Sequence, residues 1–337
     1  MKRFYGIRVR QVQFVLILMM PFCSYGQKTG DNTVAPSRML RIYEDNDFIN
    51  ITGNSTDKAY TNGTRLDYFY TRRHPAGWLP RAGHNSINIA SWGITELMIT
   101  PNDLSITSFQ PDDYPYSTAL YVSHCLYSYN TAKKFSLQTE LLAGIRGPAA
   151  LGEQTQAFIH RVLKFQKPQG WSNQLQNKLL LNINVAAEKQ VYRYQNKLDI
   201  IGGARLEAGT MAAGLTFYPI IRLGKMNPYF GGLIAQYTNP GKKQPANKKN
   251  IQLYLLFKPG ISFYASNGML QAGHQRFSSE GGNETLASIK RTVWFFNGGA
   301  VLSVNRVGIS FNQNYSSALM QHLYAHGIGN FSLYYAL

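Results

Sequence analysis

Alternating apolar and polar residues recur along most of the chain after residue 37, in segments separated by Gly, Asn, Asp and Ser. In one of these segments, for example, Leu66, Tyr68 and Tyr70 occupy every second position. A period of two predicts β-strands whose two faces meet different surroundings. The segments that fit this pattern are Met39–Phe48, Ala59–Tyr70, Ser86–Thr100, Tyr116–Tyr129, Phe135–Arg146, Leu179–Arg193, Leu198–Gly209, Met211–Leu223, Ile251–Ala265, Arg291–Val304, Val307–Tyr315 and Gly329–Leu337.

An even number of strands, with a strand at each end of the series, allows the first and last strands to pair and close the sheet. The composition agrees with a barrel that faces lipid, because the chain has 22 Tyr, 18 Phe and only 15% charged residues. No stretch after the N-terminus reaches the roughly 18 consecutive apolar residues of a membrane-spanning helix. The sequence therefore predicts an all-β protein, a twelve-stranded antiparallel transmembrane β-barrel formed by residues 27–337 as one domain.

The first 26 residues have the pattern of a secretory signal peptide. Four basic residues within the first ten positions precede the apolar run Val12–Phe22, and small or polar residues follow up to Gly26. A buried N-terminal helix and a lipoprotein signal that ends at Cys23 are alternative interpretations. Export combined with a barrel predicts location in a bacterial outer membrane.

The chain is strongly basic, with a formal net charge of +17. Such a charge favours anionic partners. Nucleic acid is not expected, because the chain is exported and lacks a recognisable nucleic-acid-binding module. An anionic lipid is the better candidate, although the lysine-rich stretch Lys242–Lys249, as a solvated loop, accounts for part of the excess charge.

One segment, Pro148–Phe165, has helical periodicity and interrupts the β pattern between the fifth and sixth strands. Gln156 and His160 are four residues apart and therefore share one face of this helix. A histidine here could be a general base or simply a packed structural residue. No HExxH zinc motif and no GxSxG nucleophile elbow occur in the chain.

Two further polar groups lie where strands are predicted to end or bend. Glu44-Asp45-Asn46-Asp47 offers oxygen ligands of the kind that Ca²⁺ prefers, or else forms a solvated strand end. Alternation places Asp45 and Asp47 on one face of the strand, and Glu44 and Asn46 on the other. The second group, Tyr60-Thr61-Asn62-Gly63, predicts a bulge or a close backbone approach within a strand.

The joint spacing of several motifs resembles that of the outer-membrane lipid A 3′-O-deacylase family. The motifs that carry the resemblance are Asn46-Asp47, Asp57, Tyr60-Thr61-Asn62-Gly63-x-Arg65-Leu66, Gln110-Pro111-Asp112-Asp113-x-Pro115-Tyr116, Gly144-x-Arg146-Gly147-Pro148, Gln156-x-x-x-His160 and Pro168-x-Gly170-Trp171-x-Asn173-Gln174-Leu175. The resemblance is specific over about residues 39–192, and only the rhythm of strands agrees beyond them.

This resemblance implies a twelve-stranded barrel with a calcium-dependent site near its outer rim and lipid A, or a related acylated lipid, as substrate. It implies that His160 is the general base and Asp47 the calcium-associated carboxylate. Asn46, Thr61 and Gln156 would be supporting polar residues. A basic residue of the family between the third and fourth strands has no counterpart in Ser105–Gln110.

Two other functions are compatible with the sequence. A non-catalytic barrel, a pore or a structural protein, would need the strands but not the pair Gln156 and His160. A phospholipase that acts on glycerophospholipids would share the mechanism and differ only in its substrate.

Overall fold

A computed structural model describes residues 37–51, 59–72, 77, 79–239, 250–273, 275, 277–279, 282–284 and 286–337. The predicted signal peptide, Asp57 and the lysine-rich stretch Lys242–Lys249 lie outside the described residues. In the described part of the chain, no helix is both long and apolar enough to cross a membrane.

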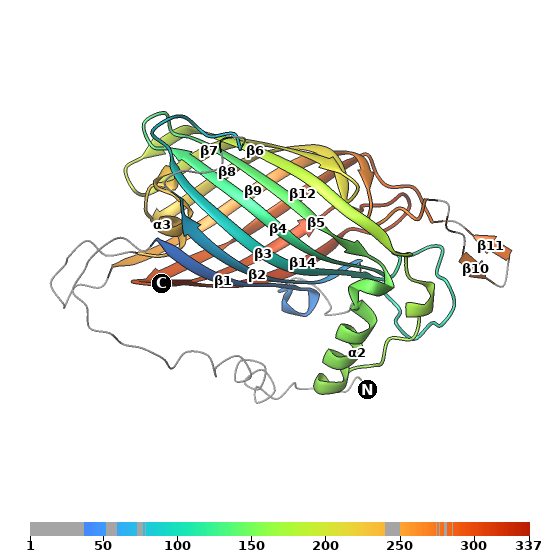
Figure 1. The fold of residues 1–337 in the computed structure, drawn as a ribbon. Coiled ribbons are helices and arrows are strands. Elements are labelled where there is room, and N and C mark those ends of the chain that lie inside the picture. The colour runs from blue at the N-terminus through green and yellow to red at the C-terminus, as the bar shows by residue number, and fades with distance from the viewer. Residues whose placement is uncertain are drawn as a thin grey trace.

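Twelve antiparallel strands form a closed barrel, as the alternating pattern predicted (Figure 1). Each strand pairs with its neighbours along the chain, and the first strand pairs with the last, with Met39 opposite Ala336 and Asn46 opposite Gly329. The strands are β1 (Arg38–Asn46), β2 (Ala59–Thr71), β3 (Ile87–Thr100), β4 (Ser117–Asn130), β5 (Phe135–Arg146), β6 (Lys178–Tyr194), β7 (Leu198–Gly209), β8 (Ala212–Lys225), β9 (Ile251–Asn267), β12 (Thr292–Val304), β13 (Val307–Ser316) and β14 (His326–Ala336). A separate hairpin of β10 (Phe277–Ser279) and β11 (Gly282–Glu284) extends the connection between β9 and β12.

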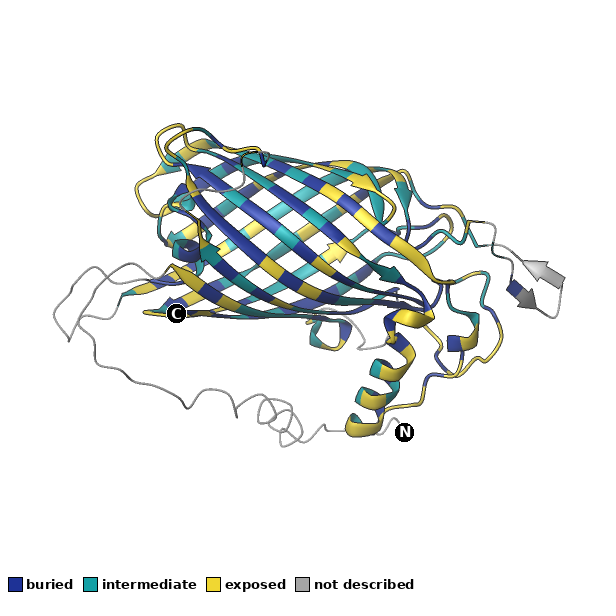
Figure 2. Ribbon diagram, viewed as in Figure 1, coloured by how far each residue is buried: buried dark blue, intermediate teal, exposed yellow. Residues whose placement is uncertain are grey.

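Exposed and buried residues alternate along the barrel wall (Figure 2). In β3, for example, Trp92 and Ile94 are exposed, whereas the intervening Ser91, Gly93 and Thr95 are buried. Apolar side chains therefore cover the outer surface and polar ones face the lumen, which is the arrangement of a barrel in a membrane.

Charged side chains cross the middle of the lumen in a connected network. Asp67 on β2 accepts hydrogen bonds from Arg41 at 2.6 Å and from Arg65 at 2.8 Å. Glu140 on β5 lies 3.4 Å from Arg65 and 3.2 Å from Arg205 of β7. Because each buried charge faces an opposite charge, the network ties strands on different sides of the barrel together.

Apolar clusters close the lumen on both sides of this network. At the end that holds the C-terminus and the start of β1, the connection from β8 to β9 folds into the 3₁₀ turn η5 (Tyr229–Gly231) and the short helix α3 (Leu233–Tyr237). Phe230 and Ile234 of this connection pack against Phe69 and Tyr334 of the wall.

At the opposite end, a second apolar cluster brings wall and loop residues together. Leu142 and Leu180 of the wall pack there with Leu270, Ile289 and Met320 of the loops. The described parts of the connections before and after β9 lie at opposite ends, because β9 runs the length of the barrel between them (Figure 1).

Replacing Glu140 with Ala should lower the free energy of unfolding by about 3 kcal/mol, because it removes a nearly buried carboxylate that faces two arginines. Urea unfolding of the protein in lipid vesicles measures this difference. Glu207→Ala is the matched control: its carboxylate is more exposed and faces only Arg205, so roughly 1 kcal/mol is expected. Equal losses in the two variants would contradict a central role for Glu140.

Candidate active site

Helix α2 (Gly152–Leu163) projects from the barrel at the end opposite to the C-terminus and the start of β1, between β5 and β6 (Figure 1). The predicted helix from Pro148 to Phe165 is shorter in the structure. A 3₁₀ turn, η3 (Pro148–Ala150), comes first, and Leu151 and Lys164 adopt left-handed conformations at either end of α2. These two residues therefore set the bounds of the helix.

Close contacts and one hydrogen bond hold the start of α2 against the outer wall. Gly152 lies against Thr118 of β4, and a β-carbon at this position would lie 1.8 Å from the Thr118 hydroxyl oxygen. Thr155 donates a hydrogen bond of 2.9 Å to Glu96 of β3. Glu96 is on the same face of β3 as the exposed Trp92 and Ile94, so the helix covers a carboxylate that would otherwise face lipid.

Gln156 and His160 share one face of α2, as their spacing predicted, and both are buried on a helix that is otherwise largely exposed. The Gln156 side-chain oxygen accepts a hydrogen bond of 2.8 Å from the indole nitrogen of Trp171. His160 Nδ1 lies 2.5 Å from the backbone oxygen of Gln166. Both side chains are therefore held in defined orientations.

Asn46 and Asp47 lie where β1 ends. The Asn46 side chain accepts a hydrogen bond from the backbone N–H of Phe48 at 2.9 Å and caps the 3₁₀ turn η2 (Asp47–Ile49). The expectation that Asp45 and Asp47 share a strand face is wrong, because this cap ends the strand at Asn46. Asp45 points into the lumen, where Tyr43, Tyr60 and Asn330 donate to its carboxylate, whereas Asp47 lies buried in the turn.

Thr61 lies at an irregularity in β2, where the register shifts between Tyr60 and Asn62. Its hydroxyl is 2.7 Å from that of Thr100, the last residue of β3. The bulge predicted at Tyr60-Thr61-Asn62-Gly63 is thus confirmed. Since Asn62 pairs directly with Asn46, the bulge brings Thr61 close to the end of β1.

Aromatic contacts connect the end of β1 with the end of α2. The ring of Phe165 lies edge-on to His160, with 5.7 Å between the ring centroids. The same ring lies 5.9 Å from that of Phe48, which directly follows Asp47. Phe48 and Phe165 thus connect the end of β1 with His160 on α2.

A row of polar side chains continues the site down the outer wall. Glu44 accepts hydrogen bonds from Asn62 at 2.5 Å and from Thr64 at 2.7 Å. Thr64 pairs with Glu44 on one side and with Glu96 on the other. Glu96 is not among the residues predicted for the site, although a single carboxylate among the lipid-facing positions of a strand is a signal that it has a polar partner.

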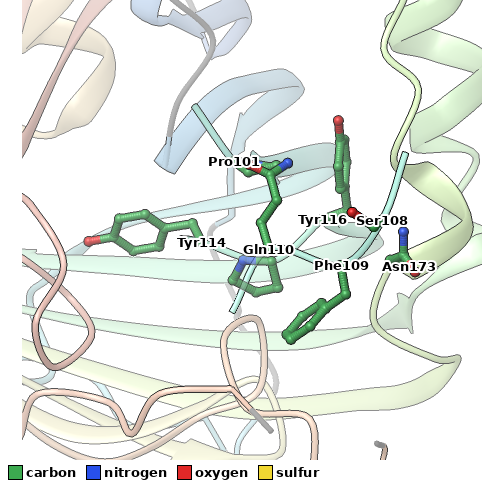
Figure 3. Close-up of a pocket in the computed structure, with 8 residues that line it drawn as sticks. Pro101, Ser108, Phe109, Gln110, Tyr114, Tyr116 and Asn173 are labelled. Atoms are coloured by element: carbon green, nitrogen blue, oxygen red, sulfur yellow. The ribbon is translucent and has the colours of Figure 1, made fainter. Parts of the chain in front are cut away.

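The connection between β3 and β4 contacts the segment that follows α2. A small pocket lies between this connection and Asn173, and Figure 3 shows the residues that line it. Asn173 donates a hydrogen bond of 2.7 Å to the backbone oxygen of Thr107. Hydrogen bonds from the hydroxyl and backbone of Ser105 lower the pKa of Asp103.

Two tyrosines at the same end pack edge to face, and neither replaces the missing basic residue. Burial raises the pKa of Tyr114. Burial together with a hydrogen bond of 2.6 Å to Asp113 raises the pKa of Tyr324. Both groups are therefore neutral at pH 7, and the motif that contains Gln110 and Asp113 serves to pack the loops.

The described residues include no group of three or more His, Cys, Asp or Glu side chains that could hold a metal ion. The polar groups near the end of β1 are oxygen donors: Asp47 lies in the turn η2, and Thr61 lies on β2 beside Asn62, which pairs with Asn46. Oxygen donors of mixed type suit Ca²⁺, which accepts carbonyl, hydroxyl and water ligands beside a single carboxylate. They do not suit Zn²⁺, which prefers nitrogen and sulfur ligands.

Comparisons with known proteins identify related barrels. A family profile described as outer membrane protein LpxR matches residues 12–337. LpxR from Salmonella typhimurium has a similar structure, with a TM-score of 0.69 and 16% sequence identity over 89% of this chain and 100% of that one. No curated protein has a matching sequence.

Two autotransporter barrels are more distant. The beta domain of the Bordetella autotransporter BrkA has a TM-score of 0.43 and 9% identity over 90% of this chain and all of that one. The translocator domain of NalP from Neisseria meningitidis has a TM-score of 0.42 and 10% identity over 91% and 90% of the two chains.

Replacing Gly152 with Ala should detach α2 from the wall without opening the barrel, because the new methyl group would overlap the Thr118 side chain. We expect faster trypsin cleavage at the exposed residues Arg161 and Lys164, with unchanged heat modifiability on gels. Gly231→Ala is the matched control, since the nearest atom to its β-carbon would be 3.9 Å away. Cleavage at the wild-type rate in Gly152→Ala would show that the close contact does not hold the helix.

Proposed function

We propose that this chain, which belongs to the LpxR family of outer membrane proteins, is a lipid A deacylase that hydrolyses the 3′-acyloxyacyl ester. The observation that carries the proposal is the unusual burial pattern of α2. The polar residues Gln156 and His160 are buried against the barrel, while Phe158, Val162 and the following Phe165 are exposed. A helix that hides polar groups and exposes apolar ones suits a reaction on a lipid.

His160 is oriented to act as a general base. A carbonyl oxygen can only accept hydrogen bonds, so the contact with Gln166 requires the hydrogen of neutral His160 to be on Nδ1. The basic nitrogen is then Nε2, which takes a proton from water as the water oxygen bonds to the ester carbonyl carbon. The carbon–oxygen bond of the ester then breaks, and the leaving alkoxide receives the proton from the imidazolium to give a free hydroxyl and a fatty acid.

Calcium is the cofactor that the oxygen donors at the end of β1 suit best. Asp47 would hold the ion, with Thr61 and the Asn46 turn beside it. When bound, Ca²⁺ supplies positive charge that stabilises a developing oxyanion. The side chain of Asn46 caps the turn in which Asp47 is buried. The bulge at Thr61 shifts the register of β2 against β3 beside this turn.

Charge and location favour an anionic lipid of the outer leaflet as substrate. Arg161, Lys164 and Lys167 are exposed on and just after α2, where they can contact phosphate groups in place of the missing basic residue. The site lies at the end opposite to the C-terminus and the start of β1, and we assign this end to the extracellular rim of the barrel. A phospholipase would use the same chemistry, and lipid analysis distinguishes the two.

Expression of the protein should release an acyloxyacyl chain from lipid A, and His160→Ala should abolish this release while the barrel stays folded. Mass spectrometry of extracted lipids measures the loss, and heat modifiability verifies the fold. His84→Ala, an exposed histidine at the other end, is the matched control and should retain activity. Unchanged lipid A in cells with folded protein and calcium would exclude the deacylase. Shortened glycerophospholipids would indicate a phospholipase.

Removing calcium with a chelator should abolish activity, and adding calcium back should restore it. Asp47→Ala should raise the calcium concentration needed for half-maximal activity by at least about tenfold, because the ion would lose its carboxylate ligand. Asp103→Ala, an exposed carboxylate at the same end, should leave that concentration unchanged. Full activity of the wild-type protein in excess chelator would refute the calcium site.

A further inference from the structure

Trp171 makes a contact that the proposed mechanism does not yet use. It lies in the short 3₁₀ turn η4 (Trp171–Asn173), is 1% exposed, and its ring packs on that of Tyr116 with 4.7 Å between centroids. Its indole nitrogen lies 2.8 Å from the side-chain oxygen of Gln156. A large aromatic residue thus reaches the site helix through one hydrogen bond.

The surroundings of Trp171 fix its position firmly. Gly170 lies so close to Tyr116 that a β-carbon there would be 2.6 Å from the ring, so only glycine allows this approach. The backbone N–H of Gln169 donates to the oxygen of Leu104 at 2.8 Å. Met98 and Leu104 complete the buried cluster around the indole. The ring is therefore anchored to the barrel rather than to α2.

The chemistry of the indole group determines how Gln156 is turned. An indole N–H can only donate a hydrogen bond, so the atom that faces it must be the amide oxygen of Gln156. The amide NH₂ group then points away from Trp171. Gln156 lies one helical turn before His160 on the same buried face, so its amide group is a neighbour of the proposed general base.

We propose that Trp171 is a positioning residue that holds the Gln156 amide as a hydrogen-bond donor to the carbonyl oxygen of the ester during hydrolysis. This proposal rests on the proposed deacylase function. Negative charge develops on that oxygen in the transition state, and a donor fixed in advance stabilises it. Without the indole, the Gln156 amide could rotate by about half a turn, so that its oxygen would face the ester. The amide oxygen would then repel the negative charge on the ester oxygen.

Three variants separate this role from simple packing. Trp171→Phe keeps an aromatic ring on Tyr116 but removes the N–H group. Gln156→Glu can still accept the hydrogen bond from Trp171, but as a carboxylate it cannot donate. Gln156→Ala removes both functions. Trp294→Phe is the matched control, because Trp294 is 63% exposed on the outer surface of β12.

We expect Trp171→Phe to lower kcat about tenfold with little change in KM, because the interaction is made in the transition state. Gln156→Ala and Gln156→Glu should each lower kcat on the order of 10²-fold. The double variant Trp171→Phe/Gln156→Ala should be no slower than Gln156→Ala alone, since both changes remove one interaction. Trp294→Phe should match the wild-type protein.

Two results would overturn the proposal in an active enzyme. If Gln156→Glu retains wild-type kcat while Gln156→Ala does not, Gln156 is only an anchor for Trp171. If Trp171→Phe matches Trp294→Phe in kcat, the indole N–H has no role in the reaction. Gln156→Glu keeps the size of the side chain, so it decides the matter even if Trp171→Phe does not fold.

A binding measurement distinguishes failure of this inference from failure of the proposed function. A lipid A analogue with a phosphonate in place of the scissile ester carries the negative oxygen permanently. Trp171→Phe should bind it about tenfold more weakly than the wild-type protein, with unchanged affinity for the ester. An inactive wild-type protein refutes the deacylase, whereas equal phosphonate affinity in the two proteins refutes the role of Trp171.

Discussion

Closure of the sheet is the constraint on which the rest of the structure depends. In hydrocarbon, an unpaired backbone N–H or C=O group costs several kcal/mol, so the edges of β1 and β14 must pair with each other. This pairing also fixes which side chains point outward. The ends of β1, β2 and β3 are therefore neighbours at one rim, and Asn46, Thr61 and Thr100 lie together although up to 54 positions separate them in the sequence.

The outer wall departs from its apolar pattern beside α2. Glu44, Asn62, Thr64 and Glu96 occupy positions that elsewhere on the wall carry residues such as Trp92. Outward-facing carboxylates are costly in lipid, and here they are paired with amide and hydroxyl groups. The helix completes this arrangement. Thr155 donates a hydrogen bond to Glu96, and the hydrophobic side chains of α2 face outward in place of the carboxylate. The polar side chains of the wall are thus accommodated because α2 lies beside them.

The sequence predicted the barrel well because alternation is a local signal that every strand repeats. It also placed Gln156 and His160 on one helix face, since a spacing of four residues determines this without any tertiary information. It misplaced Asp47, because a single capping hydrogen bond from Phe48 to Asn46 ends the strand two residues early. The roles of Glu96 and Trp171 depend on contacts across 59 and 15 positions, which no local pattern encodes.

The barrel wall is held by many contacts, whereas helix α2 is attached to it by few. This difference suits the proposed reaction on a lipid. The lumen is crossed by ion pairs and closed by apolar clusters, so the strands of the wall are tied together and the barrel is poorly suited to be a pore. The helix, in contrast, touches the wall through a few specific contacts at Gly152, Thr155 and Gln156. These contacts leave Phe158 and Val162 on the exposed side of the helix and hold Gln156 against a tryptophan that is itself anchored to the barrel. Polar groups that are held in this way have a defined geometry, as the proposed function requires.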